Sequence, residues 1–130
     1  MLKRSMFGVY VKGSFEAVDF YQQAFGAKLL WGVKSEDGNS YIHAELDVFG
    51  QILAISEALP EAEERTAGNI MQFNLHFGEG SEEAVKKAYE ILKDDAQIQL
   101  PLGEYSFVPS PLMFGLTDKF GVNWCLYITS

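Results

Sequence analysis

Two short stretches of this chain recur, in the same order, in its second half. The first pair is Gly13 to Val18 and Gly80 to Val85, which read GSFEAV and GSEEAV. The second pair is Asp47 to Gly50 and Asp118 to Gly121, which read DVFG and DKFG. Both matches fall at equivalent points in the pattern of strands and helices described next. A duplicated structural unit explains them together, and this constrains the fold more than any other feature.

The apolar pattern of the first half predicts four strands and one helix. Alternation up to Gly13 predicts a strand at 6–12. Ser14 is placed to cap a helix that carries one apolar stripe and ends at Gly26. Further strands are predicted at 28–35, 40–48 and 51–57, joined by turns at 36–39 and 49–50.

The second half repeats this order. We expect a strand at 69–77, a helix that opens at Gly80-Ser81, a short strand at 97–100, an irregular proline-containing loop at 101–111, and strands at 112–117 and 122–129. The chain is thus predicted to be α+β, with two tandem βαβββ modules that form a curved mixed sheet around a cleft and carry their helices on the outer face. Its 130 residues suit one domain with module one at 1–57, a linker at 58–68 and module two at 69–130.

Alternation along the strands also predicts which side chains lie under the helices and which point away. The helix side is assigned Phe73, Leu75 and Phe77 in the fifth strand, Ile42, Ala44 and Leu46 in the third, and Val122, Trp124, Leu126 and Ile128 in the last. The opposite side then receives Gln72, Asn74, His76, Tyr41, His43, Glu45, Asp47, Asn123, Cys125 and Tyr127. Such a polar and aromatic face is either exposed to solvent or lines a ligand cleft.

Composition excludes several classes of protein. The formal charge of −8 and the scattered basic residues argue against a nucleic-acid partner. No run approaches the roughly 20 apolar residues that span a bilayer, and no signal-peptide cleavage site follows the basic start, so no membrane partner is expected. Cys125 is the single cysteine, which favours a reducing compartment, and we expect the protein to be cytoplasmic. The acidity favours a soluble surface over the alternative, a pocket for cationic ligands.

Four longer stretches carry a family resemblance. They are Phe20 to Gly26 (FYQQAFG), Tyr41 to Leu46 (YIHAEL), Gln99 to Gly103 (QLPLG) and Met113 to Trp124 (MFGLTDKFGVNW). With the βαβββ duplication they resemble the vicinal oxygen chelate superfamily of glyoxalases and bleomycin-resistance proteins, and more narrowly its PhnB-like branch. Members of that branch are often labelled demethylubiquinone methyltransferases. The chain has no glycine-rich segment opening a helix in a parallel βαβ unit to hold a methyl donor, so this label carries little weight.

The resemblance also implies where a metal would be bound. Metal-using relatives take one ligand from each of the first, fourth, fifth and eighth strands, and these positions fall here on Met6, Ala54, Gln72 and Cys125. Met6 offers only a thioether and Ala54 offers no donor, so the set does not suit a divalent ion. We expect the metal centre of the family to be lost, and no cofactor.

Nine residues are candidates for lining the ligand cleft: Tyr10, Tyr41, His43, Glu45, Gln72, Asn74, His76, Cys125 and Tyr127. His43 and Glu45 leave two interpretations open, a relocated acid–base or metal site or, as the pattern favours, a structural ion pair. Cys125 is expected to be a small residue at the edge of the core rather than a nucleophile. Tyr10 and Tyr127 either line a pocket or cover the sheet.

The leading hypothesis is a metal-independent PhnB-like protein that binds a small or flat organic molecule. The first alternative is a glyoxalase-like lyase or dioxygenase with a relocated metal site around His43, Glu45 and Gln72. The second is a bleomycin-type antibiotic-binding resistance protein. We also expect a homodimer, because the segment with Tyr105, Phe107, Leu112, Met113 and Phe114 is costly to leave in water.

Overall fold

A computed structural model describes residues 1–59 and 64–129 of the chain. The predicted linker at 58–68 lies partly outside these residues. Contacts within the chain divide it into two compact units, residues 1–66 and 67–130. In the part of the chain that the structure describes, neither helix is long and apolar enough to cross a membrane.

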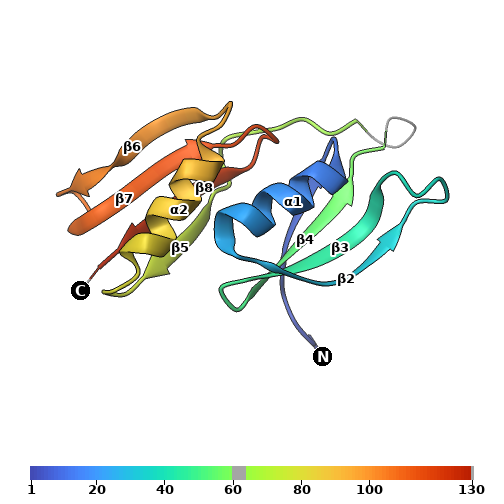
Figure 1. Ribbon diagram of the computed structural model, residues 1–130, viewed down its shortest axis with the longest axis horizontal. Coiled ribbons are helices and arrows are strands. Elements are labelled where there is room, and N and C mark those ends of the chain that lie inside the picture. Colours follow the sequence, from blue (N-terminus) through green and yellow to red (C-terminus); the bar gives the residue numbers. More distant parts are fainter. Residues whose placement is uncertain (60–63, 130) are drawn as a thin grey trace. The chain divides into compact units, whose positions relative to one another are not determined.

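The two units have the same architecture (Figure 1), which confirms the duplicated βαβββ fold. The first contains β1 (Phe7–Val11), α1 (Ser14–Phe25), β2 (Lys28–Lys34), β3 (Tyr41–Val48) and β4 (Gln51–Glu57). The second contains β5 (Phe73–Phe77), α2 (Glu82–Leu92), β6 (Gln97–Tyr105), β7 (Ser110–Thr117) and β8 (Asn123–Ile128). The sheet orders are β1-β4-β3-β2 and β5-β8-β7-β6. Each sheet is mixed, because its first and last strands in sequence pair in parallel and the others pair antiparallel.

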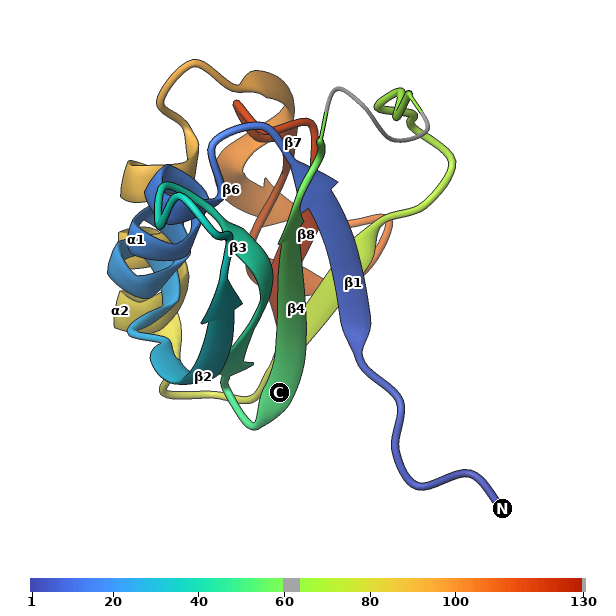
Figure 2. The same ribbon diagram turned by 90° about the vertical axis from the view of Figure 1, so that its right-hand side faces the viewer.

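Each helix covers one face of its own sheet, as Figure 2 shows for α1 in the first module. The buried residues of α1 are Ser14, Ala17, Val18, Phe20, Tyr21, Ala24 and Phe25, and those of α2 are Val85, Ala88 and Leu92. Leu75 and Trp124 are buried on the strands of the second module, and Phe73 packs edge-on against Trp124. The face assignments for β5 and β8 are therefore consistent with the structure.

The repeated Asp-x-Phe-Gly stretches both lie at the last hairpin of their module, but the two turns differ. Val48 pairs with Gln51 directly across Phe49 and Gly50, whereas Thr117 pairs with Asn123 across residues 118–122. The Gly50 amide donates to Asp47 Oδ1, and the Phe120 amide donates to Asp118 Oδ1. Each turn ends on a glycine with a positive φ, 86° at Gly50 and 89° at Gly121. Side chains disfavour that conformation, so the repeated glycine has a physical cause.

The start of α1 differs from the prediction. Gly13 precedes the helix with a φ of 89°, and the Ser14 hydroxyl accepts a hydrogen bond from the Tyr41 amide instead of capping the helix. The carboxylate of Glu57, at the end of β4, accepts hydrogen bonds from the amides of Gly13 and Ser14 at 3.0 and 2.8 Å. Partial burial alone would raise the pKa of Glu57, but these two bonds outweigh it and lower that pKa. Glu57 therefore caps the N-terminus of α1 and ties it to the end of β4 in the same module.

The predicted irregular loop at 101–111 is wrong over much of its length. Strand β6 continues through Pro101 to Tyr105, and β7 begins at Ser110. The β6–β7 pairing shifts register three times along this stretch. Proline has no backbone N–H to donate to a neighbouring strand. Because β6 is at the edge of the sheet and has only β7 as a neighbour, it can include Pro101 without losing a hydrogen bond to a strand on its other side.

Alternation also fails at the start of β3. Tyr41 was assigned to the face away from α1, but its ring packs 4.7 Å from that of Phe15 on the helix. Ile42, assigned to the core, is 53% exposed. The β2–β3 register shifts between Val33 and Lys34. Because of this irregularity, Tyr41 and Ile42 each lie on the face opposite to the one that strict alternation assigns them.

The face assignment in β5 predicts unequal costs for neighbouring substitutions. Leu75→Ala should lower the free energy of unfolding by about 2–5 kcal/mol, because it leaves a cavity beneath α2. Asn74→Ala should change it by less than about 1 kcal/mol, because that side chain is exposed. Denaturant melts measure both, and equal losses would contradict the assignment.

Candidate functional site

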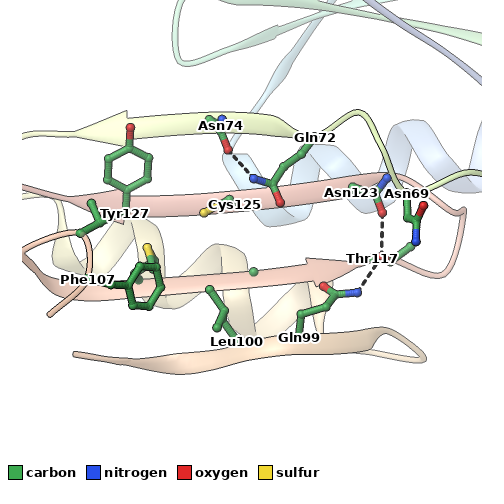
Figure 3. Close-up of a pocket in the computed structure, with 13 residues that line it drawn as sticks. Asn69, Gln72, Asn74, Gln99, Leu100, Phe107, Thr117, Asn123, Cys125 and Tyr127 are labelled. Carbon is green, nitrogen blue, oxygen red and sulfur yellow. Dashed lines mark hydrogen bonds between the residues drawn. The ribbon is translucent and has the colours of Figure 1, made fainter. Parts of the chain in front are cut away.

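The second module carries a pocket of about 500 Å³ on the face of its sheet that points away from α2 (Figure 3). All four strands of that sheet contribute to it. Its lining residues are Asn69, Gln72, Asn74, Gln99, Leu100, Phe107, Val108, Met113, Gly115, Thr117, Asn123, Cys125 and Tyr127. The pocket is therefore built within one module.

One end of the pocket is held by a chain of hydrogen bonds. Gln99 Nε2 donates to Thr117 Oγ1 at 3.0 Å, and Thr117 Oγ1 donates to Asn123 Oδ1 at 2.7 Å. Asn123 Nδ2 donates in turn to the carbonyl oxygens of Gly68 and Met71 at 2.9 and 2.8 Å. Asn123 thus fixes the segment that enters β5, and its polar atoms are already used.

A second pair of carboxamides lies in the wall formed by β5. Gln72 Nε2 donates to Asn74 Oδ1 at 2.7 Å. Gln72 immediately precedes β5 and lies two positions before Asn74, and the bond between their side chains places both on the same side of the sheet. In Figure 3 the pair lies above Cys125, with Tyr127 to one side and Asn123 to the other.

The other end of the pocket is apolar and aromatic. Phe107 and Tyr127 lie there in Figure 3, while Leu100, Val108 and Met113 complete the apolar lining. Cys125 is 9% exposed, and burial raises the pKa of its thiol, so the thiol is neutral at physiological pH. The pocket combines an apolar surface for a ring with amides for hydrogen bonding.

Among the described residues that line the pocket there is no Asp, Glu, Lys, Arg or His. The acidity of the chain is therefore located outside this site. An ionic ligand would lose water without gaining a countercharge from these side chains. The lining suits an uncharged molecule.

The corresponding face of the first module carries an ion cluster. The Arg4 guanidinium donates to both carboxylate oxygens of Glu45, at 2.7 and 3.0 Å. His43 Nε2 lies 2.8 Å from Glu45 Oε2, and the His43 ring packs against Trp31. The bonds from Arg4, then from His43, outweigh burial and lower the pKa of Glu45 to about 2. The cluster ties the segment before β1 to the sheet, as the structural interpretation of His43 and Glu45 predicts.

Four of the nine predicted cleft residues line the pocket, namely Gln72, Asn74, Cys125 and Tyr127. His76 belongs to the same module, but it stacks on Tyr127 and is hydrogen-bonded to Thr129. Tyr10, Tyr41, His43 and Glu45 belong to the first module, where Tyr10 lies beneath the guanidinium of Arg65. These five residues are not in the pocket lining.

Sequence reasoning missed the contribution of β6 and β7. Gln99, Leu100, Phe107 and Val108 lie on or beside the stretch predicted to be an irregular loop. Met113, Gly115 and Thr117 alternate along β7, and this period-two pattern was a usable signal for a shared face. Asn123 was assigned to the correct face but was not chosen as a candidate.

The residues at the family's metal positions do not fit a divalent ion. Ala54 has no donor atom, and Met6 offers a thioether. In residues 1–59 and 64–129, no three His, Cys, Asp or Glu side chains come together as a metal site. At Glu45, a metal ion would have to displace the guanidinium of Arg4.

The chain matches the family model described as the Glyoxalase/Bleomycin resistance protein/Dioxygenase superfamily over residues 4–126. Among solved structures it resembles a PhnB protein of Bacillus cereus, described as a putative 3-demethylubiquinone-9 3-methyltransferase, with 23% identity, a TM-score of 0.76, and coverage of 98% of this chain and 100% of that one. It resembles protein PA1353 of Pseudomonas aeruginosa with 21% identity, a TM-score of 0.73 and 98% coverage of both chains. It resembles the fosfomycin resistance protein FosX of Listeria monocytogenes with 18% identity, a TM-score of 0.63, and coverage of 100% of this chain and 95% of that one. These likenesses show the fold, and a comparison with curated proteins gives no match.

The Glu45 cluster predicts a specific dependence of stability on pH. A carboxylate whose pKa is lowered on folding, here from 4.5 to about 2, stabilises the fold above pH 4.5 and loses that contribution as the pH falls towards 2. Glu45→Gln should therefore be less stable than the wild type at pH 6, and the difference should shrink at pH 2–3. Arg4→Ala should show part of the same effect and the exposed neighbour Lys3→Ala none. A difference that stays constant from pH 6 to pH 2 would contradict the ion pairing.

Proposed function

The chain belongs to the glyoxalase/bleomycin resistance protein/dioxygenase superfamily, and we propose that it is a PhnB-like, metal-independent binding protein for an uncharged small molecule. The pocket of the second module is the binding site. The observation that carries this proposal is the lining of that pocket, which offers carboxamides and an aromatic end without an ionic side chain. Its volume of about 500 Å³ falls within the range of small-molecule sites, roughly 300–1,000 Å³.

Neither alternative function gains support from the described residues. A bleomycin-type site for a cationic antibiotic would need acidic groups in the pocket, and the acidic residues lie elsewhere. A lyase or dioxygenase with a relocated metal would draw on His43 and Glu45, whose side chains already pair with each other and with Arg4. Ligand binding without metal chemistry requires neither feature.

Metal independence predicts the outcome of a simple assay. Protein purified without chelator should contain far less than one equivalent of Zn²⁺, Ni²⁺, Mn²⁺ or Fe²⁺ by elemental analysis, because Met6 and Ala54 cannot complete a ligand set. Binding of an uncharged aromatic probe should be unchanged by EDTA. About one metal per chain, lost together with probe binding on chelation, would refute the proposal.

We further propose that the protein is a cytoplasmic homodimer. Cys125 is a buried free thiol, which suits a reducing compartment. Phe107, Val108 and Ile98 are 67, 38 and 42% exposed on and beside the edge strand β6, and a partner would remove them from water. Met113 and Phe114, expected in the same interface, are instead buried in the module at 2 and 0% exposure.

The dimer is tested by light scattering at low micromolar concentration. We expect a mass of twice the 14.5 kDa of one chain. Phe107→Glu should weaken association with little change in the melt, whereas Ile42→Glu, at an exposed apolar position of the first module, should leave the mass unchanged. A wild-type mass of one chain would refute the dimer.

A further inference from the structure

We infer that the ligand of the second-module pocket carries a hydrogen-bond donor and an acceptor side by side on a flat, uncharged ring, as a lactam or a cyclic imide does. This inference rests on the proposed function and names the chemical class of its ligand. It is carried by the paired carboxamides of Gln72 and Asn74.

The Gln72–Asn74 bond uses one polar atom of each amide. Because Gln72 Nε2 donates to Asn74 Oδ1, the acceptor Gln72 Oε1 and the donor Asn74 Nδ2 are left over. Within the described part of the chain, neither remaining atom has a protein hydrogen-bond partner. The wall of the pocket thus presents one acceptor and one donor on adjacent side chains.

This pattern does not depend on how the two amides are oriented. If both were rotated by 180°, Asn74 Nδ2 would donate to Gln72 Oε1, and Gln72 Nε2 and Asn74 Oδ1 would be left over. One donor and one acceptor remain in either case. A ligand edge with one N–H and one C=O satisfies the pair in both orientations.

The surroundings of the pair select the rest of the ligand. Asn74 lies opposite Cys125 in the β5–β8 register, and the neutral thiol provides a small, uncharged floor beside the amides. The rings of Tyr127 and Phe107 lie towards the apolar end of the same pocket (Figure 3). An aromatic ring system fused to an amide would place its polar edge on Gln72 and Asn74 and its apolar body towards these rings.

Probes of similar ring shape, with and without a ring N–H, show whether binding depends on that hydrogen-bond donor or on the shape of the ring alone. The probes are 2-quinolone, which is a flat lactam, its N-methyl derivative, the lactone coumarin, and the anion 2-naphthoate. Isothermal titration calorimetry with the full chain should give the tightest binding for 2-quinolone. Coumarin and N-methyl-2-quinolone should bind about tenfold more weakly, because neither carries the ring N–H that donates to the unused amide oxygen of the pair.

Variants then assign the preference to the pair. The double variant Gln72→Ala/Asn74→Ala removes the acceptor of the lactam N–H in either orientation of the amides, and it should bring the ratio of the 2-quinolone and coumarin dissociation constants close to one. The melt reports that the variant is folded. Gln97→Ala, at an exposed carboxamide on β6 outside the pocket lining, should leave the ratio unchanged.

Each other outcome overturns a defined statement. Equal binding of 2-quinolone and coumarin by the wild type, or a preference that survives the double variant Gln72→Ala/Asn74→Ala, overturns the inference and leaves the proposed function standing. Binding of 2-naphthoate ahead of every uncharged probe overturns both. Failure of all four probes to bind overturns the inference, while the metal assay tests the proposed function separately.

Discussion

The parallel pairing between the first and last strands of each module is the constraint on which the rest of the structure depends. It joins β1 to β4 and β5 to β8, which are far apart in the sequence of each module. A parallel neighbour requires a crossover, and the helix provides it while covering one face of the sheet. In the second module this pairing sets Asn74 beside Cys125 and His76 beside Tyr127. The wall and the floor of the pocket are therefore assembled by one strand register.

The sequence supports the duplication strongly because its signals have local physical causes. The Asp-x-Phe-Gly turns need a carboxylate that accepts amides and a glycine with positive φ, so these residues recur. The faces of β5 and β8 are predictable because regular strands alternate strictly. In contrast, the cap on α1 comes from Glu57, which is distant in sequence, and no local pattern identifies it.

Errors in the sequence-based prediction arise where tertiary structure overrides local rules. A register shift at Val33 and Lys34 sends Tyr41 to the helix side, and a bulge of this kind has no clear signature in a single sequence. The prolines at 101, 109 and 111 indicate a loop, yet the edge strand β6 accommodates Pro101. That one error also hid Phe107 and Val108, two apolar residues of the pocket lining. A site assembled from several strands is only as predictable as its least regular strand.

The register shows how one duplicated scaffold gives two different faces. In the first module Glu45 pairs with Ala54, and in the second Gly115 pairs with Cys125, so Gly115 occupies the position equivalent to Glu45.

Counting along the same strands, Met113 stands where the first module has His43, and Thr117 stands where it has Asp47. Along this strand, Glu45, His43 and Asp47 of the first face thus correspond to uncharged residues in the second. The replacement of a glutamate by Gly115 also removes a side chain that would project into the space now lined by Leu100 and Cys125. Three alternating positions of β7 therefore contribute no charge to the pocket, while the pairing of this strand with β8 matches that of β3 with β4.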